Sequence, residues 1–177
     1  MADQKSSANT SAGLSFWGWP AVISLLVFLL DQGTKIWVDS ACPVGWQYSV
    51  IPRVFTLVHV RNTGSAWGMF SQHTWALALC SIVAFLVLIW KFRKWNEGYW
   101  PTAGALALLL GGIAGNMLDR VVRHSVIDFL SFHWDYHEFP AFNIADSAIT
   151  VSVFLLLFLS FRGSDADKKD KAPDKEE

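Results

Sequence analysis

The chain has 177 residues, of which 53% are hydrophobic, and its apolar residues gather in four long blocks separated by charged stretches. This profile is typical of a membrane protein. A formal net charge of −1 gives no support for a nucleic-acid partner. The two cysteines, Cys42 and Cys80, form no paired-thiol metal signature.

The four apolar blocks have the length of membrane spans, because about 17–25 apolar residues cross the roughly 30 Å of hydrocarbon in a bilayer. They run over about Phe16–Leu30 with an extension to Val38, Thr74–Trp90, Pro101–Leu118 and Ile144–Phe161. We therefore expect a mainly α membrane protein whose four transmembrane helices occupy residues 16–161. Residues 1–15 form a polar tail, and the charged residues 162–177 are expected to be disordered.

The end of the first block carries an acid and a base on one helix face. Asp31 and Lys35 are four residues apart, the spacing at which a helical ion pair forms. Two interpretations stay open: an ion pair that fixes the depth of the helix, or a role at the mouth of an active site.

The segment between the first two spans predicts a small β platform over about residues 40–71. Val50–Val60 is rich in β-branched and aromatic residues and indicates one or two short strands. The following Asn62-Thr63-Gly64 predicts a tight turn.

The third block contains Gly111 and Gly115, a spacing of small residues that lets helices approach closely.

Basic residues set the expected orientation of the chain in the membrane. One side would carry Lys5, Lys91, Arg93, Lys94, Arg162 and the tail lysines, and the other Lys35, Arg53, Arg61, Arg120 and Arg123. The first set is larger, so we expect both termini in the cytoplasm and the β platform outside.

Two acids lie between the third and fourth blocks. Asp119 is followed by Arg120, which favours an ion pair or a helix-end cap. Asp128 is flanked by Val126, Ile127, Phe129 and Leu130, and such an apolar setting raises the pKa of a carboxyl group.

A third acid, Asp146, follows Asn143 by three residues at the start of the fourth block. An acid there complements the helix dipole without any catalysis. Acids at the membrane edge are nevertheless costly, by roughly 2.5–3.5 kcal/mol on insertion scales, which favours a use for them. Two carboxylates about 3 Å apart share one proton, so Asp128 and Asp146 could activate a water.

A set of motifs in this order resembles lipoprotein signal peptidase, also called signal peptidase II. The motifs are Asp31-x-x-x-Lys35, Asn62-Thr63-Gly64-Ser65-Ala66-Trp67, Gly115-Asn116-x-x-Asp119-Arg120, Val126-Ile127-Asp128-Phe129 and Phe142-Asn143-x-Ala145-Asp146-Ser147. The family often has Phe where this chain has Trp67, which affects only the fine fit of a substrate.

The resemblance implies an aspartic endopeptidase of the bacterial inner membrane, without metal or other cofactor. Its substrate would be a prolipoprotein with a diacylglyceryl-modified cysteine, cut just before that cysteine. Asp128 and Asp146 would be the catalytic pair. Substrate-binding positions would be Asn62, Asn116, Arg120 and Asn143, with Asp31, Lys35 and Asp119 as accessory residues. The resemblance also implies inhibition by globomycin-type cyclic peptides; we further expect a monomer in contact with membrane lipids.

Three other interpretations compete with this one. His133 and His137 are four apart, a spacing that binds zinc on a helix face, although no third ligand is evident. Intramembrane acids also serve ion pathways in transporters, but these acids lie near one membrane face. In a purely structural scaffold, replacing Asp128 would have no effect on activity.

Overall fold

The computed structural model describes residues 4–64, 73–96, 99–134 and 137–170. Within these ranges the chain forms four helices and four strands. The helices are α1 (Gln4–Ala41), α2 (Thr74–Asn96), α3 (Trp100–Val122) and α4 (Ile144–Asp170). Each contains a span of 19 to 24 residues with a mean hydropathy of at least 1.5, enough to cross a membrane. The prediction of four transmembrane helices is confirmed.

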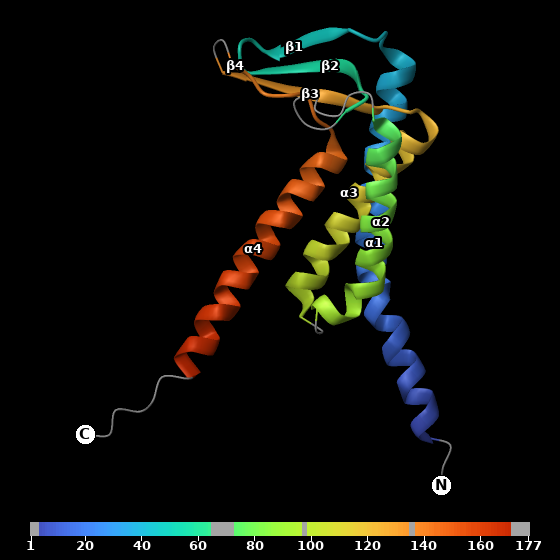
Figure 1. Ribbon diagram of the computed structural model, residues 1–177, viewed down its shortest axis with the longest axis vertical. Helices are drawn as coiled ribbons and strands as arrows, with labels where there is room; N and C mark the ends of the chain where they lie inside the picture. The colour runs from blue at the N-terminus through green and yellow to red at the C-terminus, as the bar shows by residue number, and fades with distance from the viewer. Residues whose placement is uncertain (1–3, 65–72, 97–98, 135–136, 171–177) are drawn as a thin grey trace, which may run out of the picture.

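Helix α3 lies at the centre of the bundle, because it contacts α1, α2 and α4. Its glycines allow that position. A Cβ on Gly111 would lie 2.6 Å from the carbonyl oxygen of Ser24 in α1, and one on Gly112 would lie 2.7 Å from that of Ala145 in α4. The predicted close helix approach is therefore confirmed, and it involves both α1 and α4. Helix α4 diverges from the other three helices toward its C-terminal end (Figure 1).

An antiparallel sheet covers one end of the bundle (Figure 1). Its order is β1 (Gln47–Ile51), β2 (Phe55–Asn62), β3 (Val126–Trp134) and β4 (His137–Glu138). The first two strands confirm the platform predicted from Val50–Val60. Strand β3 was not predicted, although its alternation of β-branched and aromatic residues favours a strand. Residues 65–71 of the expected platform lie outside the described residues.

Helices α1 and α4 extend beyond the apolar blocks into the two tails. Helix α1 already begins at Gln4, and α4 continues through Gly163 to Asp170. Extending an existing helix costs far less than nucleating one, so an apolar span can propagate into polar flanking sequence. The disorder expected from residue 162 stays a prediction, and residues 171–177 lie outside the described part.

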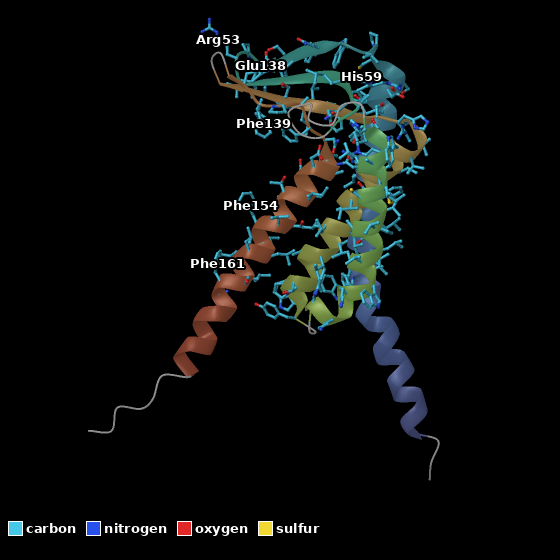
Figure 2. The ribbon with its side chains drawn as sticks, in the orientation of Figure 1. Arg53, His59, Glu138, Phe139, Phe154 and Phe161 are labelled. Atoms are coloured by element: carbon cyan, nitrogen blue, oxygen red, sulfur yellow. The ribbon has the colours of Figure 1, made fainter. Side chains whose placement is uncertain are left out.

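The two histidines of the zinc interpretation do not lie on a helix. His133 is on β3 and His137 on β4, and the two strands pair as a hairpin. The four-residue spacing therefore does not place the two histidines on one face of a helix. His133 Nδ1 lies 3.6 Å from Oε1 of Glu138, a residue of β4 that is labelled in Figure 2.

Candidate active site

Strand pairing brings Asn62 and Asp128 together. In the register of β2 and β3, Val60 pairs with Asp128 and Asn62 pairs with Val126. Asn62 and Asp128 are therefore diagonal neighbours on one face of the sheet. Asn62 Nδ2 donates to Asp128 Oδ2 over 3.1 Å.

The segment before α4 is tied to the same strand. Phe142 N donates to the carbonyl oxygen of Leu130, and the carbonyl oxygen of Phe142 accepts from the N–H groups of Phe129 and Leu130 at 3.0 and 2.9 Å. This extended pairing fixes where α4 begins. Asp146, in the first turn of α4, is thereby held beside β3, although 18 residues separate it from Asp128 in the sequence.

Asn143 connects the two acids. Its Oδ1 accepts the backbone N–H of Asp146 at 2.9 Å, and its own N–H donates to Asp146 Oδ2 at 3.3 Å, a reciprocal cap of the helix N-terminus. Its Nδ2 donates to Asp128 Oδ1 at 2.7 Å. The side chain of Asn143 is completely buried, so these contacts hold it in one orientation.

Asn116 of α3 holds the carboxylate of Asp146 in place. Its Nδ2 donates to Asp146 Oδ1 over 2.7 Å. Its Oδ1 accepts from Lys35 Nζ at 2.9 Å, which fixes the amide orientation. A chain of contacts thus runs from α1 through α3 to the first turn of α4.

Lys35 belongs to a buried ionic cluster between α1 and α3. Its Nζ lies 2.8 Å from Asp31 Oδ2 and 3.0 Å from Asp119 Oδ2, and all three side chains are 0% exposed. Asp31 Oδ1 also accepts the N–H of Ala145 in α4 at 2.9 Å. Asp119 Oδ2 accepts the N–H of Ile127, beside Asp128, at 3.3 Å. The predicted Asp31–Lys35 pair is confirmed; it lies inside the bundle, beside the first turn of α4.

Asp119 forms the expected ion pairs, but not with Arg120. Its partners are Lys35 and Arg123, and Arg123 Nη1 also donates to Gln32 Oε1 at 3.0 Å. Adjacent residues on a helix point in different directions, whereas residues four apart share a face, which explains the choice of Arg123. Gln32 and Arg123 were not identified from the sequence as part of this cluster. The available signals were that Gln32 follows Asp31 directly and that Arg123 lies one helical turn after Asp119.

Arg120 lies near Asp128 and Asp146 and lines the same cavity as they do. Its guanidinium interacts electrostatically with Asp146 and Asp128. Arg120 Nη1 is 3.4 Å from the carbonyl oxygen of Asn116, and its buried Nε has no hydrogen-bond partner among the described residues. This side chain therefore keeps a free donor near the acids.

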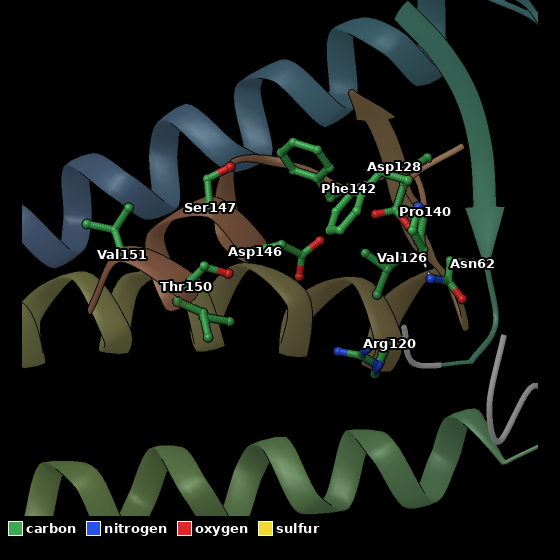
Figure 3. Close-up of a pocket in the computed structure, with 13 residues that line it drawn as sticks. Asn62, Arg120, Val126, Asp128, Pro140, Phe142, Asp146, Ser147, Thr150 and Val151 are labelled. Carbon is green, nitrogen blue, oxygen red and sulfur yellow. Dashed lines mark hydrogen bonds between the residues drawn. The ribbon is translucent and has the colours of Figure 1, made fainter. Parts of the chain in front are cut away.

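The acids line a cavity of about 470 Å³ where the sheet meets the bundle. Figure 3 shows Asp128, Asp146, Asn62 and Arg120 around it, with Phe142 and Val126 beside them. The remaining lining residues are Phe139, Pro140, Ala141, Ser147, Ile149, Thr150 and Val151. The cavity therefore joins a small charged centre to a mostly apolar wall.

The cavity changes the acid strength of Asp128, whose side chain is almost completely buried. Burial and then the negative charge of Asp146 raise the pKa of Asp128 to about 7, against the opposing effect of hydrogen bonds from Asn62 and Asn143. Near neutral pH this carboxyl group is therefore able to hold a proton and to release it.

All nine residues singled out in the sequence lie in one connected region. Asp128, Asp146, Asn62 and Arg120 line the cavity, Asn116 and Asn143 hold the acids, and Asp31, Lys35 and Asp119 form the buried cluster behind them. Among the described residues, no group of three or more His, Cys, Asp and Glu side chains has the arrangement of a metal site.

Comparison with known proteins gives a consistent set of relatives. A model of the signal peptidase (SPase) II family matches residues 23–162. The chain is 40% identical over 157 residues to the lipoprotein signal peptidase of Pseudomonas putida, a match covering 85% of this chain and 90% of that protein. It is 35% identical over 140 residues to the lipoprotein signal peptidase of Listeria welshimeri, covering 79% and 91%.

Solved structures of bacterial membrane enzymes share the fold. One aligns with a TM-score of 0.79 at 29% identity, covering 90% of this chain and 95% of that chain. Another aligns with a TM-score of 0.71 at 31% identity, covering 80% and 92%.

Proposed function

Because this chain belongs to the signal peptidase II family, we propose that it is an aspartic endopeptidase acting on diacylglyceryl-modified prolipoproteins. It removes the signal peptide by cutting just before the lipidated cysteine. The observation that carries the mechanism is that Asp128 and Asp146 line one cavity and are joined through Asn143. We call these two acids the dyad.

The dyad works with one shared proton. Asp128 holds that proton, in keeping with its raised pKa. Asp146 is the base, because it lies in the first turn of α4, where the helix dipole favours a carboxylate, and the Asn116 amide and the Asn143 N–H both donate to it. Asp146 takes a proton from water as the water oxygen attacks the scissile carbonyl carbon, and Asp128 protonates the carbonyl oxygen.

Collapse of the tetrahedral intermediate then breaks the C–N bond. Asp146 delivers its proton to the leaving amine of the lipidated cysteine, and Asp128 recovers its proton from the hydroxyl that becomes the new carboxyl group. The guanidinium of Arg120, a residue that lines the cavity, is available to a peptide carbonyl of the substrate.

The apolar wall of the cavity suits a lipidated substrate. A diacylglyceryl group gains about 0.8 kcal/mol per buried CH₂, which keeps its cysteine at the membrane interface. The cavity adjoins the first turn of α4, a helix long and apolar enough to cross a membrane, which supports a position at that interface. The cleft is also where cyclic peptide inhibitors of the globomycin type would bind.

We place the enzyme in the bacterial inner membrane with both termini in the cytoplasm. The ends of α1 and α4 at Gln4 and Asp170 lie at the end of the bundle away from the sheet (Figure 1). The basic residues Lys91 and Lys94 follow the apolar part of α2, and they favour the cytoplasmic side for its C-terminal end. A single chain supplies the dyad and the described cavity lining, which supports a monomer.

The substrate class is tested with two peptides of one sequence, with and without the diacylglyceryl group. Purified protein in lipid should cut only the lipidated peptide, and mass spectrometry should locate the new N-terminus at the modified cysteine. Equal cleavage of both peptides, or a cut elsewhere, would contradict the proposed substrate.

A further inference from the structure

A second cavity, of about 490 Å³, lies at the end of the bundle away from the dyad. Trp95 and Tyr99 line it near the α2–α3 connection, Thr102 lines it from the first turn of α3, and α4 contributes Leu156, Ser160 and Arg162. Seventeen residues of α3 separate Thr102 from Asp119, roughly 25 Å along a helix. No part of the proposed peptidase chemistry uses this cavity.

The lining changes from polar to apolar along α4. Arg162 follows the apolar residues of α4, so we expect its charged end at the membrane interface. Leu159 and Leu156 lie three and six residues before it, so they reach roughly 9 Å deeper into the hydrocarbon layer. Leu156 also packs against the buried cluster around Phe92 and Leu106. The cavity thus has the charged side chain of Arg162 at one end and apolar side chains of the bundle core at the other.

The polar end carries the positive charge of Arg162. Arg162 is exposed, and it makes no ion pair with a residue whose side chain the structure describes. The side chain of Tyr99, the N-cap residue of α3, accepts no hydrogen bond from the first turn. The positive end of the α3 dipole therefore adds to the charge of Arg162.

We propose that this cavity binds an anionic phospholipid. Its phosphodiester would pair with Arg162 and accept hydrogen bonds from Tyr99, Thr102 and Ser160, while an acyl chain lies along Leu159 and Leu156. Basic pockets between transmembrane helices bind acidic headgroups in this way. Charge argues against the basic N-terminal region of a signal peptide as the occupant, since Arg162 repels it.

Native mass spectrometry of the full-length protein tests the proposal. The protein is mixed with equal amounts of phosphatidylglycerol and phosphatidylcholine of the same acyl chains, and the retained lipid is counted. Loss of one cation at a membrane surface weakens anionic lipid binding about fivefold. We expect Arg162→Gln to retain about fivefold less phosphatidylglycerol than the wild type, and Arg162→Lys to retain as much as the wild type. The amount of retained phosphatidylcholine should be the same for all three proteins.

Lys94→Gln provides the matched control, because Lys94 is exposed on α2 and does not line the cavity. An equal loss with Lys94→Gln would show general surface attraction and overturn the site. Unchanged retention in folded Arg162→Gln would overturn it as well. Displacement of the lipid by inorganic phosphate or by a basic signal-peptide segment would identify that ligand as the occupant and reject the phospholipid.

Discussion

Asn143 donates a 2.7 Å hydrogen bond from Nδ2 to Oδ1 of Asp128, a residue on a different secondary-structure element. Its Oδ1 meanwhile caps α4 at the N–H of Asp146. One amide therefore performs two tasks: it starts the helix that carries one acid, and it orients the other acid.

These two tasks can be separated by substitution. Asn143→Ser keeps a good N-cap, so the melting temperature should stay near that of the wild type, but the donor to Asp128 is lost and kcat should fall about 10- to 100-fold. Asn143→Ala loses both, and it should also lower stability by about 1 kcal/mol. Thermal unfolding and peptide cleavage measured on the same samples decide this. Equal activity of Asn143→Ser and wild type would reject the orienting role.

The pH dependence of cleavage should follow Asp128. Its raised pKa of about 7 means that its proton is lost as the pH rises through 7, so kcat should fall on the alkaline side. The hydrogen bond from Asn62 lowers the pKa of Asp128. Asn62→Ala should therefore shift the alkaline limb to higher pH, while lowering the maximum rate. A limb that shifts to lower pH, or does not shift, would contradict the protonated role of Asp128.

The buried ionic cluster of Asp31, Lys35 and Asp119 should contribute strongly to the free energy of unfolding. Lys35→Met leaves Asp31 and Asp119 without their shared cation, and removing one partner of a buried ion pair costs about 3–5 kcal/mol. In the double variant Lys35→Met/Asp31→Asn, Asp119 still has Arg123 as a partner. The double variant should therefore recover part of the melting temperature, and a further decrease would argue against charge imbalance as the cause.

The contact between α3 and α4 should tolerate no side chain at Gly112. A Cβ there would lie 2.7 Å from the backbone oxygen of Ala145 and 2.8 Å from Ile149 Cγ1, so α4 must move. We expect Gly112→Ala to cost about 1–3 kcal/mol and to reduce cleavage, because Ala145 adjoins Asp146. Gly104→Ala is the control on the same helix, since its Cβ would lie 3.8 Å from the Trp19 ring. Equal behaviour of the two variants would contradict this assignment.

Much of the site could be predicted from local patterns. Helix spacing places Lys35 one turn after Asp31, and Asn143 three residues before Asp146 identifies a helix start. Long-range pairing could not be predicted in this way. The approach of Asn62 to Asp128 depends on the register between β2 and β3, which 66 residues of chain separate.

The predicted pairing of Asp119 with Arg120 failed for a related reason. Neighbours in the sequence diverge around a helix axis, so the true partners were a residue one turn later and a lysine on another helix. Strand β3 was not predicted, because a short apolar run such as Val126–Leu130 does not by itself distinguish a strand from a buried helix segment.

The most direct measurement compares cleavage of a diacylglyceryl-modified prolipoprotein peptide by wild type, Asp128→Asn and Asp146→Asn. Asp39→Asn serves as control, because Asp39 pairs with Arg61 away from the cavity. We expect both dyad variants to be folded and inactive, the Asp39 variant to be active, and a chelator to have no effect. Substantial cleavage by either folded dyad variant would contradict the assignment of Asp128 and Asp146 as the catalytic pair.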